Sequence, residues 1–240
     1  MDLCDIHHEA GKPIVPAFYA ALRFIKETGP DFVVLKGDIG EWGMFSPHTK
    51  SQPLLREGLR YKDDCEAIKR DILEPLRPHT KRLEFIMGNH EEWVVRWVEE
   101  NPGIEGKIDL IKDLELFQAN IHSTPHNEVL PIGSLNFAHG WYCNKHHAAK
   151  HLDVISDHIF YGHTHDHQSH TKITRTGRNP YIGMSTGCLC NQNPYWLRNR
   201  PNNWLHGFGI YEIRGNGEFT PHFIPIIDGV FSYGGEVWKA

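Results

Sequence analysis

Short apolar runs recur along the first two-thirds of the chain, and each is followed within two residues by a glycine. Four such runs are Phe32–Leu35, Leu83–Met87, Leu135–Ala138 and His158–Tyr161. Short apolar runs closed by glycine are typical of strands buried inside a sheet. The pattern therefore predicts four buried strands.

Between these runs, apolar residues repeat about every four positions, which is the period of an amphipathic helix. Pro13 stands where a first helical turn accepts proline, and Asn101-Pro102 follows a later helical segment as a stop signal. Four helices are predicted, marked by Ile14, Phe18, Leu22 and Ile25; by Ile68, Ile72 and Leu76; by Trp93, Val94, Trp97 and Val98; and by Ala148, Leu152 and Ile155.

The pattern changes after residue 166, where alternating segments are separated by Gly, Asn and Pro. These segments predict strands at Thr171–Thr176, Tyr181–Ser185, Phe208–Ile213 and Phe219–Ile227. We therefore expect a single α/β domain over residues 1–240, with packed sheets, helices outside them and a β-rich part from 167 to 240.

Composition narrows the class of protein. The chain is 40 % hydrophobic and 23 % charged, which excludes a disordered chain or a coiled coil. It has no apolar run that could span a membrane and no signal-peptide core, so no membrane partner is expected. Five scattered cysteines favour a reducing, cytoplasmic location, and a net charge of −5 gives no general attraction to nucleic acid.

The chain contains 18 histidines, and several of them follow the predicted strands directly. Ligands bind beyond the carboxyl ends of strands in open α/β sheets, so side chains placed there converge. In Asp5-x-His7 and His163-x-His165, residues two apart on an extended chain would face one ion. The converging set is Asp5, His7, Asp38, Asn89, His90, His139, His163 and His165.

Mixed carboxylate, amide and imidazole ligands suit Mn, Fe, Ni, Zn or Co better than Mg or Ca. A shared carboxylate such as Asp38 is what two ions about 3.5–4 Å apart require. We therefore expect two divalent transition-metal ions.

The order Asp-x-His, Gly-Asp, Gly-Asn-His-Glu, His-Gly, Gly-His-x-His over residues 5–165 resembles the calcineurin-like metallophosphoesterases. The resemblance implies a four-layered α/β/β/α sandwich. It also implies that Asp38 bridges the two metals together with a water or hydroxide, and that Glu91 orients a catalytic His90. The implied ligands are Asp5, His7 and His165 for the first metal, and Asn89, His139 and His163 for the second. The family has a full apolar strand before its first Asp-x-His, whereas only Met1 to Cys4 precede Asp5 here.

The activity implied is metal-dependent hydrolysis of phosphate esters, with phosphodiesters favoured, including nucleotides or nucleic acid. The alternatives are a phosphomonoesterase or protein phosphatase, or a metal-binding scaffold without catalysis. The sequence leaves the oligomeric state open.

A segment without acidic residues, 167–211, bears on the substrate. It carries Lys172, Arg175, Arg178, Arg198 and Arg200, with aromatic residues between them. Cations that follow a phosphate backbone and rings that stack on bases are what a single-stranded nucleic acid needs. Arg198, Arg200, Trp196 and Trp204 are the predicted substrate contacts; the alternative is a basic surface over buried aromatic residues.

Other residues have plainer interpretations. We expect His8 not to be a ligand, His147 and His151 to lie on a solvated helix face, and Cys188-x-Cys190 to pack after a strand. Trp93 and Trp97 are expected to anchor their helix. Glu41 could orient a ligand or sit in a solvated loop, and Trp42, Met44 and Phe45 could wall the site or pack.

Overall fold

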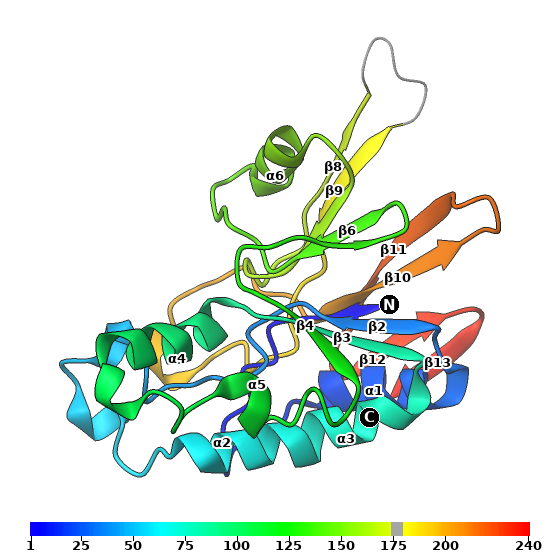
Figure 1. The fold of residues 1–240 in the computed structure, drawn as a ribbon. Coiled ribbons are helices and arrows are strands. Elements are labelled where there is room, and N and C mark those ends of the chain that lie inside the picture. The colour runs from blue at the N-terminus through cyan, green and yellow to red at the C-terminus, as the bar shows by residue number, and fades with distance from the viewer. Residues whose placement is uncertain (174–179) are drawn as a thin grey trace.

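A computed structural model describes residues 1–173 and 180–240, and two β-sheets form its centre (Figure 1). The first sheet has the strand order β11-β10-β1-β2-β3-β4 and the second has the order β5-β6-β7-β9-β8. The first contains β1 (Asp2–Leu3), β2 (Phe32–Leu35), β3 (Arg82–Ile86), β4 (Ile121–Thr124), β10 (Gly207–Ile213) and β11 (Phe219–Pro225). The second contains β5 (Leu130–Ile132), β6 (Leu135–Ala138), β7 (Ile159–Tyr161), β8 (Ser169–Lys172) and β9 (Tyr181–Ser185).

Helices cover the outer faces of both sheets (Figure 1). The first sheet is covered by α1 (Pro16–Thr28), α2 (Tyr61–Ile68), α3 (Glu74–Leu76) and α5 (Leu110–Asp113), and α4 (Asn89–Glu100) follows β3. A π-helical segment, Lys69–Leu73, joins α2 to α3. The second sheet is covered by α6 (His147–Ile155), and a hairpin of β12 (Val230–Tyr233) and β13 (Glu236–Lys239) packs beside α1.

Alternation along the strands separates three apolar clusters. In β2, Val33 and Leu35 point toward the helices of the first sheet, while Val34 joins the layer between the two sheets. In β7, Phe160 joins the same middle layer, and Tyr161 packs under α6. Side chains of successive strand residues face opposite ways, so one apolar run supplies two layers. The four-layered α/β/β/α sandwich is thus confirmed.

Several boundaries differ from the sequence-based expectation, most of them by one or two residues. The first helix begins at Pro16 rather than Pro13, because Val15 stays extended at φ −66° and ψ 150° as its N-cap. β8 spans Ser169–Lys172 and so begins two residues before the predicted Thr171–Thr176 strand. Residues 174–176 of that predicted strand lie outside the described residues. Within the described ranges, no helix combines the length and apolar character needed to cross a lipid bilayer.

The prediction that His147 and His151 form a solvated helix face is wrong. Both side chains are buried where α6 packs on the second sheet. His147 Nδ1 lies 2.6 Å from the Tyr161 hydroxyl, and His151 Nε2 accepts from the backbone N–H of Trp141 at 2.9 Å. A buried imidazole is stable when its ring nitrogens have hydrogen-bond partners, as these two have between α6 and the second sheet. The periodicity of the sequence cannot show such partners, because they come from other elements.

Candidate metal centre

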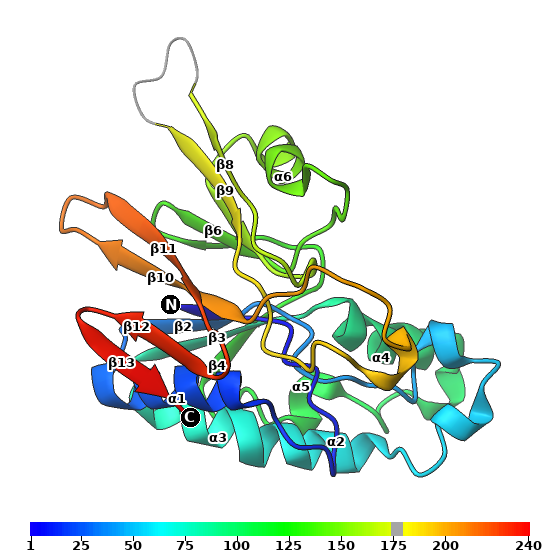
Figure 2. The same ribbon diagram turned by 180° about the vertical axis from the view of Figure 1, so that it is seen from behind.

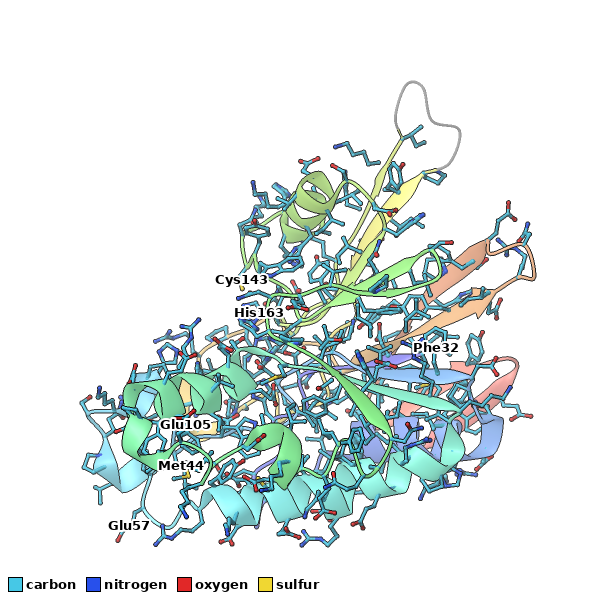
Figure 3. All side chains as sticks on the ribbon, in the orientation of Figure 1. Phe32, Met44, Glu57, Glu105, Cys143 and His163 are labelled. Carbon is cyan, nitrogen blue, oxygen red and sulfur yellow. The ribbon has the colours of Figure 1, made fainter. Side chains whose placement is uncertain are left out.

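The carboxyl ends of parallel strands from both sheets meet at one end of the molecule. β1, β2 and β3 run parallel in the first sheet, and β6, β7 and β9 run parallel in the second. Figure 3 shows His163 at this end, whereas Phe32, the first residue of β2, lies toward the opposite end. The expected ligands therefore come from loops that the topology brings together.

The backbone of this centre is strained. Asp5, His7, Asp38, His163 and His165 all have positive φ angles, between 49° and 68°. Left-handed backbone is costly for residues other than glycine and persists where the surrounding structure enforces it. The extended-chain explanation for the Asp-x-His and His-x-His spacings is therefore wrong, because the backbone is left-handed in both motifs. Asp5 and His7 reach the same group of donor atoms, whereas His163 and His165 reach two different groups.

A first group of side chains combines Asp5, His7 and His165, whose donor atoms lie within 4.8 Å of one another. His165 Nε2 is 3.2 Å from Asp5 Oδ1 and 3.2 Å from His7 Nε2. The backbone N–H of His163 donates to both carboxylate oxygens of Asp5, which fixes the carboxylate. Two ring nitrogens and one carboxylate oxygen thus point at one small volume.

A second group combines Asp38, His139 and His163, with Asn89 beside it. His139 Nε2 lies 3.3 Å from Asp38 Oδ2, 3.1 Å from His163 Nδ1 and 3.0 Å from Asn89 Oδ1. His139 Nδ1 donates to the Lys36 carbonyl at 2.8 Å, so Nε2 is the nitrogen left for the centre. A partner on the far ring nitrogen fixes tautomer and orientation in metal-binding histidines.

Asp38 stands between the two groups. Its Oδ2 lies 3.3 Å from His139 Nε2, 3.7 Å from His7 Nε2 and 3.9 Å from His90 Nε2. Its Oδ1 accepts from the His90 backbone N–H at 2.9 Å. One buried carboxylate oxygen thus contacts imidazoles of both groups, which is the geometry of a shared ligand.

Nearby carboxylates favour the charged form of two imidazoles of the centre, those of His7 and His139, whereas burial lowers the pKa of His163 to about 4. Burial opposes ionisation of His7, yet the hydrogen bond and charge of Glu41 raise its pKa to about 10. Burial opposes charging His139 too, but Asp38 raises its pKa to about 9, while His165 lowers the pKa of Asp5 to about 2 despite burial. Imidazoles crowded around buried carboxylates are the donor set of a transition-metal site, and these residues fit one.

His90 lies at the start of α4 with its ring fixed on two sides. Its Nδ1 donates to the Glu41 carbonyl at 2.7 Å, and its ring stacks on Trp93 with centroids 3.8 Å apart. Burial lowers its pKa. The Nε2 atom is thereby directed at the space beside Asp38, as a proton-transfer group requires.

The expected role of Glu91 needs correction. Its buried carboxylate accepts from the backbone N–H groups of Asp38, Ile39, Gly40 and Gly88 and from Trp42 Nε1, at 2.8–3.1 Å. Glu91 therefore holds the Asp38 loop, and His90 is oriented by the Glu41 carbonyl instead. At the third position of α4, the Glu91 carboxylate accepts from the backbone N–H of the N-cap residue Gly88, as in a capping box. Its further contacts to the Asp38 loop depend on tertiary structure, which the motif alone does not reveal.

Glu41 is the residue that the sequence left undecided. Its Oε2 lies 2.8 Å from His7 Nδ1, so Glu41 orients the expected ligand His7 with its side chain and orients His90 with its carbonyl. Trp42 and Phe45 are buried against Tyr61, so of the two alternatives for these aromatic residues the structure shows packing. His8 turns away from the centre and binds Asp71 at 2.9 Å.

A long segment between β9 and β10 runs from the strand ends toward α4 (Figure 2). Within it, Trp204 lies against His165 with ring centroids 4.2 Å apart, and Trp196 lies 5.8 Å from Trp204. Trp196 is 46 % exposed, and Arg198 and Arg200 are exposed beside it. The structure thus brings this aromatic pair to the centre; Arg175 and Arg178 lie outside the described residues.

Two further residues border the centre: Lys36, which the strand-end rule applied to β2 would have indicated, and Cys190, for which the sequence predicted only packing. Lys36, directly after β2, is fully buried and binds Asp2 Oδ2 at 3.0 Å, the Tyr161 carbonyl at 2.9 Å and Thr186 Oγ1 at 2.7 Å, which ties the two sheets together. Cys190, five residues after β9, places its Sγ 3.7 Å from His165 Nδ1.

Comparisons with known proteins add little. No family model matches the chain, and no curated protein matches it. Among solved structures, a single mutant of Vps29 from Entamoeba histolytica aligns over 100 % of this chain and 95 % of its own, with 15 % identity and a TM-score of 0.48. Likeness at this level carries no functional information.

Proposed function

We propose that this protein is a dinuclear metal-dependent phosphoesterase. The observation that carries the proposal is the placement of Asp38 Oδ2 between two groups of converging donor atoms. In this proposal Asp5, His7 and His165 hold one ion and Asn89, His139 and His163 hold the other, with Asp38 shared. The ions are Mn, Fe, Ni, Zn or Co.

When bound, two such ions would activate water and neutralise charge on a phosphate group. The chain's own residues orient the ligands and transfer the proton. Glu41 and Lys36 hold the rings of His7 and His139 in place through their far nitrogens. With Nδ1 committed to the Glu41 carbonyl, Nε2 of His90 is the atom that takes up a proton and delivers it to the leaving oxygen.

For the substrate we propose phosphodiesters, with nucleotides or nucleic acid as the natural class. Support comes from Trp204 and Trp196, which extend from the ligand His165 to an exposed surface carrying Arg198 and Arg200. Stacking on aromatic side chains and cationic contacts to phosphate are how proteins bind single strands. A phosphomonoesterase is the runner-up activity.

The proposal is tested by hydrolysis with Mn²⁺ of a bis-aryl phosphate, an aryl monophosphate and a single-stranded oligonucleotide. We expect both diesters to be cleaved faster than the monoester, and no hydrolysis after chelation. Preference for the monoester would favour the runner-up. Full metal occupancy without hydrolysis of any of the three substrates would indicate a metal-binding scaffold without catalysis.

The substrate surface has its own test, the Arg198→Ala/Arg200→Ala double variant. We expect weaker cleavage of the oligonucleotide, an unchanged rate on the small diester, and a salt dependence of oligonucleotide binding flatter by about one unit of slope per lost contact. Arg23→Ala/Lys26→Ala on α1 is the matched control, because these cations lie on the helix that packs under the first sheet. Equal effects of the two double variants would remove the nucleic-acid preference.

A further inference from the structure

His165 has two ring nitrogens with different surroundings. Its Nε2 faces Asp5 and His7, whereas its Nδ1 faces the sulfur of Cys190. The donor atoms of His165, Cys188 and Cys190 lie within 4.8 Å of one another, and all three residues are buried. This second cluster therefore shares one side chain with the proposed dinuclear centre and uses its other face.

The backbone around the cluster is fixed. Leu205 N–H donates to the His165 carbonyl and Cys188 N–H donates to the Leu205 carbonyl, both at 2.9 Å. Leu189 N–H donates to the Asp5 carbonyl at 3.1 Å. Gly187, at φ +76°, allows the close approach: a Cβ there would collide with the Leu205 carbonyl oxygen. The three donors thus stand on a framework that holds them together without a ligand.

The spacing suits a thiophilic metal ion. With metal–sulfur and metal–nitrogen bonds of about 2.3 and 2.1 Å, two ligands at tetrahedral to trigonal angles stand about 3.6–3.8 Å apart. Cys190 Sγ and His165 Nδ1 are 3.7 Å apart. Soft thiolate ligands with one imidazole select d¹⁰ ions such as Zn²⁺ or Cd²⁺ over Mg²⁺ or Mn²⁺.

We propose that His165, Cys188 and Cys190 form a separate site for a thiophilic divalent ion. Binding forms two metal–sulfur bonds and one bond to His165 Nδ1, and the two thiol protons are released to solvent. When Nε2 of His165 also holds an ion of the dinuclear centre, the ring proton is released as well, so that His165 bridges the two ions as an imidazolate. Through His165 the site is joined to the first ion position of the proposed dinuclear centre. This inference goes beyond the proposed function and does not need hydrolysis to be true.

Cadmium is the probe, because its thiolate charge-transfer absorption in the ultraviolet reports only ions bound to sulfur. The parent protein carries Cys143→Ser, which removes the exposed thiol. We expect the band to saturate at the amplitude of one sulfur-bound Cd²⁺ per chain, whatever further Cd²⁺ the carboxylate and imidazole groups take up, with X-ray absorption showing sulfur as well as nitrogen ligands. Cys188→Ser and Cys190→Ser, made separately, should each weaken binding at least tenfold, while Cys65→Ser, a buried thiol outside the cluster, should not.

Absence of the band in the parent protein would overturn the proposal, as would a band unchanged by substitution of both cysteines. The parent measurement does not depend on how well a variant folds. Mn²⁺-dependent hydrolysis of the bis-aryl phosphate by the same parent protein separates the two claims. Hydrolysis without the cadmium band would contradict only the sulfur site. The cadmium band without hydrolysis would contradict only the proposed phosphoesterase activity.

Discussion

At the scale of single residues, the centre depends on groups that orient the expected ligands as much as on the ligands themselves. Left-handed backbone at Asp38 is stabilised by the Glu91 carboxylate, which accepts from three successive N–H groups of that loop. Strain at a site persists only where neighbouring contacts compensate for it. Glu91 is that compensation here.

Glu91→Gln is therefore expected to destabilise the fold strongly. Its amide would present N–H groups to N–H donors, and several charge-assisted hydrogen bonds would be lost, at about 1.5–3 kcal/mol each. Urea unfolding of the metal-free protein measures the change. Glu92→Gln is the matched control, since Glu92 pairs with the exposed Arg96 on the same helix. Equal stability of both variants would contradict the role given to Glu91.

His90→Asn tests proton transfer. We expect it to keep its metal yet lose about 10²–10⁴-fold in turnover, because the Nε2 atom beside Asp38 is gone. The loss should shrink for aryl diesters with better leaving groups, which need less protonation. Steady-state rates over a leaving-group series measure this, and a constant loss along the series would remove the general-acid role.

At the scale of elements, the loop after β2 and the loop after β3 pass so close to each other that neither Gly37 nor Gly88 has room for a side chain. A Cβ on Gly37 would lie 2.5 Å from His139 Nδ1 and 2.7 Å from the Gly88 backbone, and one on Gly88 would collide with Asp38 Oδ1. Gly37 also has φ +88°. The glycines of the Gly-Asp and Gly-Asn-His motifs are thus required by the contact between the β2 and β3 loops.

Gly37→Ala should lower both thermal stability and metal content, because the added methyl displaces His139. Differential scanning calorimetry and elemental analysis provide the two readouts. Gly215→Ala is the control, since nothing lies within 4 Å of its Cβ position among the residues that the structure describes. Wild-type metal content in Gly37→Ala would show that the loops tolerate separation.

At α6, the free energy of unfolding is expected to depend on pH through the buried His151. Burial lowers the pKa of His151 to about 4, against about 6.5 in an unfolded chain. Between these values the unfolded state binds more protons than the folded state, so stability falls as pH drops from 6.5 toward 4, by at most about 1.4 kcal/mol per pH unit. His151→Gln should reduce the slope of unfolding free energy against pH in that window, and an unchanged slope would refute this.

Much of the element order could be predicted from the sequence, because buried strands closed by glycine and helices of regular period leave clear patterns. The apolar pattern does not predict the β12–β13 hairpin, although Gly234-Gly235 is a hairpin-turn signal. β4 was missed because Ile121–Thr124 carries polar residues at an edge. Which side chains converge could be predicted; why they converge could not, since left-handed turns and the contacts of Glu91 and Glu41 depend on tertiary structure.

At the scale of the whole molecule, the centre joins the two sheets. Asp5 and Asp38 follow strands of the first sheet, while His139, His163 and His165 follow strands of the second. Beneath them the buried ammonium of Lys36 links β1, β2 and β7. A ligand that binds only the folded state stabilises it, so ions shared by both sheets should add to the stability of the whole fold.

The central claim is that Asp38 is shared by two ions. Its most direct test is the metal content of protein purified without chelator, measured by elemental mass spectrometry in a Cys188→Ser/Cys190→Ser background so that ions on sulfur are not counted. The claim predicts two transition-metal ions per chain, and loss of both in Asp38→Ala with the fold retained by circular dichroism. Fewer than two ions in the parent, or two ions still bound in Asp38→Ala, would contradict it.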